Sequence, residues 1–212
     1  MKLPRVLLYV LVTLVGSQAF AQNAPDVSRD ALRYEATVFA GYRAGGTFDI
    51  QGSDENGDVG EHFSYALAFD YRIDPISSYE LFYSRQPTQV SLGPSRADLD
   101  VGYLMFGGTL EIDDTSSLRP YIVGLVGAGL FSPHAPDTKD ESRVAIALGL
   151  GLRVPLKPNI DMRLEARGYM TFFEKDSSVF CKSDDAGSTC LIRGNGSVFF
   201  QGEVLAGIAV SF

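Results

Sequence analysis

The sequence of 212 residues contains no tryptophan, only two cysteines and only two histidines. A structural zinc site usually needs four such ligands at characteristic spacing, and His62 and His134 lie far from Cys181 and Cys190, so we expect neither a metal site nor a cofactor. Basic residues are also few, since 18 lysines and arginines stand against 26 aspartates and glutamates. Nucleic-acid binding needs a basic patch, and the net charge of −8 therefore argues against such a partner.

After the first 21 residues, no apolar run approaches the roughly 20 residues of a membrane-spanning helix. The chain starts with a short cationic segment, continues with an apolar stretch from Val6 to Val15, and reaches Ala19-Phe20-Ala21, which is typical of a signal-peptidase site. This stretch is shorter than the roughly 20 apolar residues of a membrane-spanning helix. We therefore predict a signal peptide of the general secretory pathway over residues 1–21, a polar linker over residues 22–33 and one domain over residues 34–212.

The two cysteines are separated by a short polar segment that contains Asp184, Asp185 and Gly187. Exported proteins meet an oxidising compartment, in which nearby cysteines usually pair. We predict a disulfide between Cys181 and Cys190 that closes an exposed loop.

The rest of the mature chain alternates between apolar and polar residues with a period of two, and no stretch favours an amphipathic helix. The clearest segment sets Met162 and Leu164 on one face against Arg163 and Glu165 on the other. The pattern predicts an all-β domain of eight strands, at about residues 34–43, 62–73, 78–85, 98–112, 120–131, 143–154, 160–173 and 197–212.

Two of these strands are apolar on both faces, so their orientation depends on few residues. In the strand over residues 98–112, Asp98 and Asp100 predict that the even-numbered side chains face the interior, and Glu111 then needs either a bulge or an interfacial position. Under this assignment the interior is lined in part by Leu104, Phe106, Ile122 and Val126.

The connections alternate in length along the chain. Links after the second, fourth and sixth strands are short, whereas residues 44–61, 86–97, 132–142 and 174–196 form longer polar connections after the odd-numbered strands. Short turns at one rim and long loops at the other are typical of an antiparallel up-and-down transmembrane barrel.

Apolar and polar residues also alternate in a soluble barrel with an apolar interior. The composition of the less apolar face of each strand therefore decides between a soluble and a membrane barrel. In the sixth strand that face carries Ala145, Ala147, Gly149 and Gly151, which is a poor surface for water but suits a narrow interior. We expect an interior network of paired charges, because buried charges need partners. Its predicted members are Glu35, Arg43, Asp70, Arg72, Glu80, Arg153, Arg163, Glu165, Arg167 and Glu203.

The final strand carries apolar residues at every second position and ends in an aromatic residue. This resembles the C-terminal assembly signature of outer-membrane β-barrels, formed here by Val204, Ala206, Ile208, Val210 and Phe212. Aromatic residues near strand ends would form the interfacial girdles of such a barrel. The candidates are Tyr34, Tyr42, Tyr71, Tyr79, Phe131 and Phe172.

The mature chain resembles the small eight-stranded outer-membrane β-barrels of the OmpA, OmpX, OmpW and opacity-protein types. The segments that carry the resemblance are Phe39-Ala40-Gly41-Tyr42-Arg43, Gly107-Gly108-Thr109-Leu110, Arg119-Pro120-Tyr121 with the glycines that follow, and the final strand. The resemblance implies a monomer in the Gram-negative outer membrane, a periplasmic position for the linker, and contact with outer-membrane lipid and lipopolysaccharide. It also implies periplasmic chaperones and the barrel-assembly machinery as partners during biogenesis.

Three functions are compatible with such a barrel, because fold does not determine activity. The first is a structural or surface-interaction role through the extracellular loops, and the second is a narrow channel for small apolar solutes. The third is a lipid A-modifying enzyme, since His62 and Ser64 have the spacing of one deacylase type. We expect both side chains to point into the barrel, away from a lipid substrate, and therefore predict no enzyme.

Overall fold

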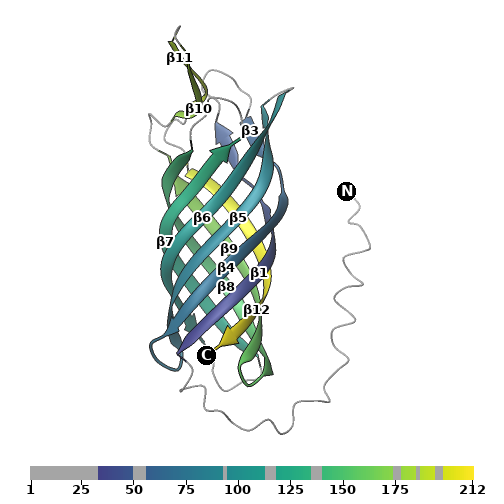
Figure 1. The fold of residues 1–212 in the computed structure, drawn as a ribbon, viewed down its shortest axis with the longest axis vertical. Helices are drawn as coiled ribbons and strands as arrows, with labels where there is room; N and C mark the ends of the chain where they lie inside the picture. Colours follow the sequence, from purple (N-terminus) through teal and green to yellow (C-terminus); the bar gives the residue numbers. More distant parts are fainter. Residues whose placement is uncertain are drawn as a thin grey trace, which may run out of the picture.

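The computed structural model describes residues 33–49, 56–92, 95–112, 118–134, 140–173, 178–184, 187–193 and 198–212. The predicted signal peptide and nearly all of the linker lie outside these ranges. Eight long strands form the wall of a barrel (Figure 1). They are β1 (Tyr34–Ala44), β4 (His62–Arg72), β5 (Ser77–Leu92), β6 (Ser95–Glu111), β7 (Arg119–Pro133), β8 (Glu141–Lys157), β9 (Ile160–Phe172) and β12 (Val198–Ser211).

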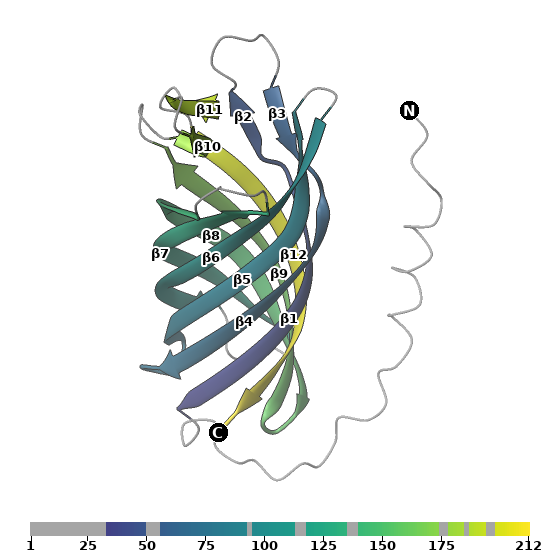
Figure 2. The ribbon, with the colours of Figure 1, turned by 45° about the horizontal axis from the view of Figure 1, so that its top comes forward.

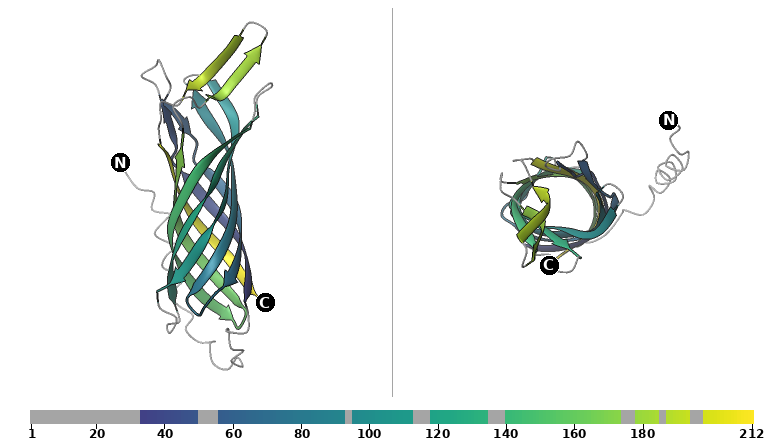
Figure 3. Two further views of the ribbon diagram at one scale, coloured as in Figure 1. Left: turned by 90° about the vertical axis from the view of Figure 1, so that its left-hand side faces the viewer. Right: turned by 90° about the horizontal axis from the view of Figure 1, so that it is seen from above.

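Each wall strand pairs antiparallel with the next one in the chain, and β1 pairs with β12 to close the barrel. In that seam Val38 lies opposite Ile208, and the paired residues run from Glu35 to Ala44 on β1. The view from above shows the ring of strands (Figure 3). The predicted closed, antiparallel, up-and-down barrel of eight strands is therefore confirmed. Within the described ranges no helix has the length and apolar character needed to cross a membrane.

The two ends of the barrel differ. Tight connections join β4 to β5 and β8 to β9 at the end where the C-terminus lies (Figure 1). In the first of them, the Asp74 carboxylate accepts hydrogen bonds from the backbone amides of Ile76 and Ser77, at 2.9 and 2.8 Å. Two short hairpins stand at the opposite end, namely β2 (Thr47–Asp49) with β3 (Asn56–Val59) and β10 (Ser178–Asp184) with β11 (Gly187–Arg193) (Figure 2).

The connection predicted over residues 86–97 is wrong for most of its length, because β5 continues to Leu92 and β6 begins at Ser95. The alternation continues there: Thr88 and Val90 are buried, and Val90 lies opposite Val59 of β3. Pairing with both β3 and β6 satisfies the backbone of this segment and extends the sheet beyond the barrel rim.

The predicted orientation of β6 and β7 is also wrong. Leu104, Phe106, Ile122 and Val126 face outward, and between 42% and 56% of each side chain is exposed. The odd-numbered residues of β6 face the interior, as shown by buried Val101, Tyr103 and Met105, and Glu111 then needs no bulge. The register explains the difference, because Met105 lies opposite buried Phe82 of β5 and directly paired residues share a face of the sheet.

Candidate functional site

The barrel is apolar outside and polar inside. Every wall strand exposes large apolar side chains on its outer face, for example Val38 at 64%, Leu148 at 61% and Phe106 at 53%. The predicted C-terminal signature lies on the same face, where Val204, Ala206, Ile208, Val210 and Phe212 are exposed. A continuous apolar surface of this extent is unfavourable in water and favourable in lipid.

Within the barrel, a network of arginines and carboxylates occupies the part nearer the tight turns. Arg163 of β9 lies at its centre and contacts Asp70 at 2.8 Å, Glu80 at 2.8 Å, Glu165 at 3.4 Å and Glu35 at 3.5 Å. Because these acids come from β1, β4, β5 and β9, a single guanidinium connects opposite walls of the barrel.

A second set of ion pairs extends the network toward the turn end. Arg153 contacts Glu35 at 2.6 Å and Glu111 at 3.1 Å. Arg119 contacts Glu111 at 3.2 Å and Asp161 at 2.7 Å. All five side chains are at least nine-tenths buried, so each charge depends on its partners rather than on water.

Nine of the ten residues that the sequence assigned to the interior network are buried, and Arg72 is half-buried near the rim. Arg167 joins the central group through Glu80, at 3.0 Å, and through Glu165. Sequence reasoning left out Glu111, Arg119 and Asp161. Asp161 lies on the same alternating face of β9 as Arg163 and Glu165, so the alternation would have identified it. Glu111 was missed because the orientation of β6 was assigned wrongly.

Nearer the hairpin end, a smaller polar layer crosses the interior. Arg43 of β1 pairs with Glu203 of β12 at 3.0 Å, and both side chains are fully buried. The Tyr169 hydroxyl donates to Glu203, and the Tyr169 ring stacks on Tyr103 with ring centres 4.1 Å apart. The guanidinium of Arg43 lies about 5 Å from both rings, an additional cation–π contact.

Above this layer three buried phenylalanines contact one another in the interior. Phe131, Phe173 and Phe199 come from three regions of the chain, and their ring centres lie 5.4 to 6.2 Å apart. Phe131 is fully buried, so its predicted place in an interfacial girdle is wrong. Its position on the interior face of β7 follows from the corrected orientation of that strand.

The two residues considered for catalysis differ in exposure. Ser64 is buried in the interior, as predicted, whereas His62, the first residue of β4, is exposed. Among the described residues, no group of three or more histidine, cysteine, aspartate or glutamate side chains is arranged to hold a metal ion.

Cys181 of β10 and Cys190 of β11 lie directly opposite each other in the hairpin. Opposed residues of an antiparallel pair have Cα atoms about 4.5 to 5.5 Å apart, within the range that a disulfide spans. The two side chains lie outside the part of the structure that is described, and the disulfide remains a prediction.

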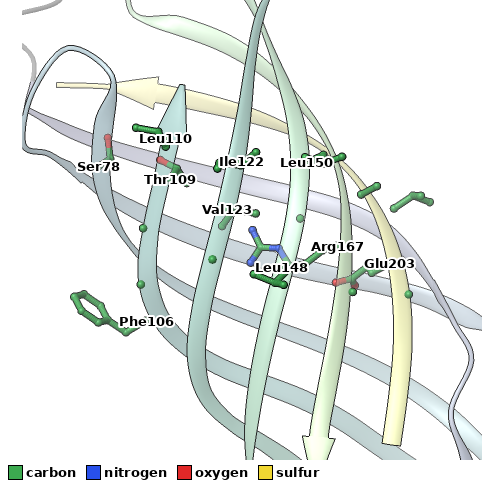
Figure 4. A pocket seen from close by; sticks show the side chains of 18 of the residues that line it. Ser78, Phe106, Thr109, Leu110, Ile122, Val123, Leu148, Leu150, Arg167 and Glu203 are labelled. Atoms are coloured by element: carbon green, nitrogen blue, oxygen red, sulfur yellow. The ribbon is translucent and has the colours of Figure 1, made fainter. Parts of the chain in front are cut away.

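Two apolar grooves run across the outer face of the wall. The larger has a volume of about 1210 Å³, and Figure 4 shows Leu110, Ile122, Leu148 and Leu150 projecting around it from β6, β7 and β8. The second has about 1040 Å³ and shares Tyr42, Leu150, Ala166 and Val204 with the first. Both lie on the surface that faces lipid in a membrane-embedded barrel.

A closed antiparallel barrel with an apolar exterior and an ion-paired interior defines a small β-barrel of the membrane-spanning class. Residues 7–190 match the outer membrane protein beta-barrel domain family, and the chain belongs to that family. No curated protein sequence matches the chain.

Solved structures agree with this fold. Neisserial surface protein A superposes with a TM-score of 0.58 at 16% identity, over 84% of this chain and 97% of that protein. The outer membrane protein OprG from Pseudomonas aeruginosa superposes with a TM-score of 0.52 at 12% identity, over 85% of this chain and 97% of that protein. At these identities the similarity shows the fold.

Proposed function

We propose that this protein is a closed outer-membrane barrel that anchors its hairpin end at the cell surface and acts there as a structural or surface-interaction protein. The apolar exterior supports insertion in lipid, and short periplasmic turns with longer extracellular segments are the usual arrangement of such barrels. The β2–β3 and β10–β11 hairpins then lie outside the cell, with the C-terminus on the periplasmic side.

The filling of the interior carries this proposal. Arg43, Arg163, Tyr103, Tyr169 and Phe131 are large and fully buried, and they occupy successive levels of the barrel. An eight-stranded barrel has an interior only about wide enough for its own side chains. The channel alternative has lost its predicted lining, because Leu104, Phe106, Ile122 and Val126 lie on the outer face.

Conductance in planar bilayers tests the closed state. We expect the pure refolded protein to give no discrete openings at moderate voltage. A porin added to the same chamber at the end of each recording shows that the bilayer reports channels. Reproducible openings whose number rises with the amount of protein would overturn the closed anchor and show that the barrel is a channel.

Export and the disulfide are parts of the same proposal. A mature chain that starts at Gln22 requires removal of residues 1–21, and the intact mass of protein purified from outer membranes measures this directly. With the disulfide formed, neither cysteine reacts with a maleimide until a reductant is added. Labelling of the unreduced, denatured protein would contradict it.

A further inference from the structure

Three carboxylic side chains lie side by side on the interior face of three neighbouring strands. Asp70 of β4 is directly paired with Glu35 of β1 on one side and with Glu80 of β5 on the other. Directly paired residues have Cβ atoms about 4.5–5.5 Å apart, and like charges at that separation are destabilising. All three residues are at least nine-tenths buried, so water does not screen their charges. Asp70, in the middle, meets the charge of both neighbours.

The two outer carboxylates each have both oxygens bonded to an arginine. Both oxygens of Glu35 accept from Arg153 at 2.6 Å. Glu80 accepts from Arg163 at 2.8 Å on Oε2 and from Arg167 at 3.0 Å on Oε1. Hydrogen bonds from cations favour the ionised form of a carboxyl group. Glu35 and Glu80 therefore carry their negative charges in the folded barrel.

Asp70 is held through one oxygen only. Its Oδ2 accepts from Arg163 at 2.8 Å, and the same guanidinium also contacts Glu35 and Glu80. The Oδ1 atom of Asp70 is buried and has no hydrogen-bond partner among the described residues. An ionised Asp70 would therefore place an uncompensated oxygen between two other carboxylates, which favours the neutral form of this group.

The charge of the network near the tight turns also leaves a carboxyl group in excess. Among the described residues, six buried carboxyl groups and four buried arginines form its ion pairs. The carboxyl groups are Glu35, Asp70, Glu80, Glu111, Asp161 and Glu165, and the arginines are Arg119, Arg153, Arg163 and Arg167. Half-buried Arg72 at the rim raises the number of cations to five. One proton on one carboxyl group balances these charges.

A narrow crevice leads from the turn end of the barrel to Asp70. Arg33, Arg72 and Arg153 line it together with Glu35 and Asp70. Arg33 is exposed and Arg72 is half-buried, so the crevice begins at the rim. It has no room for a particle of the size of water. A hydrated metal ion therefore does not fit, whereas a proton needs no such volume.

We propose that Asp70 holds a proton in the folded barrel, well above the pH at which an aspartate in water ionises, and that folding takes up this proton. Oδ2 then accepts from Arg163 as a carbonyl oxygen, and Oδ1 carries the hydroxyl hydrogen. Loss of the proton at higher pH places three adjacent carboxylates on one face of the sheet and weakens the turn end of the barrel. The interior is therefore a pH-sensitive element, whichever end of the barrel faces the cell surface.

The test compares the unfolding of the full mature protein in detergent micelles at pH 5 and pH 6. An aspartate of the unfolded chain is largely ionised in this range, because its ordinary pKa is about 3.9. If the folded state holds one more proton, stability falls as the pH rises, and the unfolding equilibrium constant grows about tenfold per pH unit. Asp70→Asn resembles the protonated carboxyl group and takes up no proton. We therefore expect the ratio of the wild-type constant to that of Asp70→Asn to rise about tenfold from pH 5 to pH 6.

Two further variants show whether the effect belongs to Asp70. Asp98→Asn makes the same change at an exposed position of β6, and we expect it to keep the wild-type dependence on pH. Glu80→Gln leaves Arg163 and Arg167 without an anionic partner, and at pH 6 it should raise the unfolding constant at least about tenfold. Asp70→Asn should not raise it. A ratio to Asp70→Asn that stays constant with pH, or a loss of stability in that variant like the loss in Glu80→Gln, overturns the proposal.

Infrared spectroscopy detects the proton without relying on stability. At pH 6 the wild type should show the carbonyl stretching band of a protonated carboxyl group, which Asp98→Asn keeps and Asp70→Asn loses. A wild type without this band overturns the proposal. Unfolding in sodium chloride and in choline chloride at equal concentration separates a proton from a metal ion. We expect equal stability in both salts, and stabilisation by sodium that is lost in Asp70→Asn would replace the proton with a metal ion.

Discussion

Arg163 and Glu80 form a 2.8 Å ion pair across the interior, although β9 and β5, the strands that carry them, do not pair with each other. Following the order of strands around the wall, β5 and β9 stand on opposite sides. Both side chains are fully buried. The pair therefore joins two opposite sides of the barrel wall.

Loss of Arg163 is expected to be among the most destabilising changes in this protein. Arg163→Met leaves Asp70 and Glu80 without their closest cation, and breaking a buried pair by removing one partner costs about 3–5 kcal/mol. Unfolding by urea in detergent micelles measures the difference. Lys157→Gln, at an exposed position, should change stability by less than about 0.5 kcal/mol; equal losses in the two variants would show that the network contributes little.

The ring of Tyr121 leaves no room for a side chain at Gly151 of β8. A Cβ atom at this position would overlap the ring of Tyr121, which cannot move freely because its hydroxyl donates to Glu165 at 2.7 Å and accepts from Arg163 at 3.1 Å. We expect Gly151→Ala to cost about 1–3 kcal/mol, as overpacking does. Gly202→Ala is the matched control, since a Cβ there meets nothing within 4 Å, and a similar loss in both variants would rule out the steric explanation.

The orientation of β6 can be tested with a charge. Leu104 faces outward, and Leu104→Arg should cost up to about 2–4 kcal/mol in a bilayer if the site lies near its midplane. Gln89→Arg places the same charge at an exposed position of β5 near the hairpin end, where we expect a cost of about 0–1 kcal/mol. Equilibrium unfolding in lipid vesicles compares the two variants. An equally small cost for Leu104→Arg would mean that hydrocarbon does not contact this face.

Asp74 gives the turn between β4 and β5 a dependence on pH. The backbone hydrogen bond from Ile76 is the largest cause that lowers the pKa of the Asp74 carboxyl below its ordinary value of 3.8, and hydrogen bonds from Ser77 add to it. Because the folded-state pKa is the lower one, the carboxylate stabilises the fold above the unfolded pKa, and this contribution is lost as the pH falls through the folded value. Asp74→Ala should therefore be less stable than the wild type at pH 7, and the gap should close below pH 3.8. Unfolding midpoints across this range measure it, and a gap that stays constant would exclude the titration of Asp74 as its cause.

Alternation along single strands was enough to predict much of this fold. In β9 every second residue from Asp161 to Arg167 is charged and the residues between are not, so only one orientation avoids placing charges in lipid. Turn residues such as Asp74 and Pro75 marked the tight connections independently. The closed eight-stranded barrel, most of the buried charges and the outward face of the last strand followed from these local features.

β6 and β7 could not be oriented this way, because both faces of each are apolar and a period of two then carries no information. Their orientation was decided by pairing: Tyr103 lies opposite Ser84 and Met105 opposite Phe82, on the interior face that β5 had already defined. The extension of β5 and β6 past the rim was likewise decided by β3, whose Val59 pairs with Val90.

The composition of each strand by itself determined which side chains are stable in lipid and which need polar partners. The reason is that the free energy of transfer from water to hydrocarbon is a property of each side chain separately. Only the closed barrel decided which partners meet. Arg163 reaches Glu80, and Arg43 reaches Glu203, because closure of the sheet brings distant strands within the length of a side chain. That distance depends on strand number and stagger, which are properties of the whole sheet rather than of any one segment.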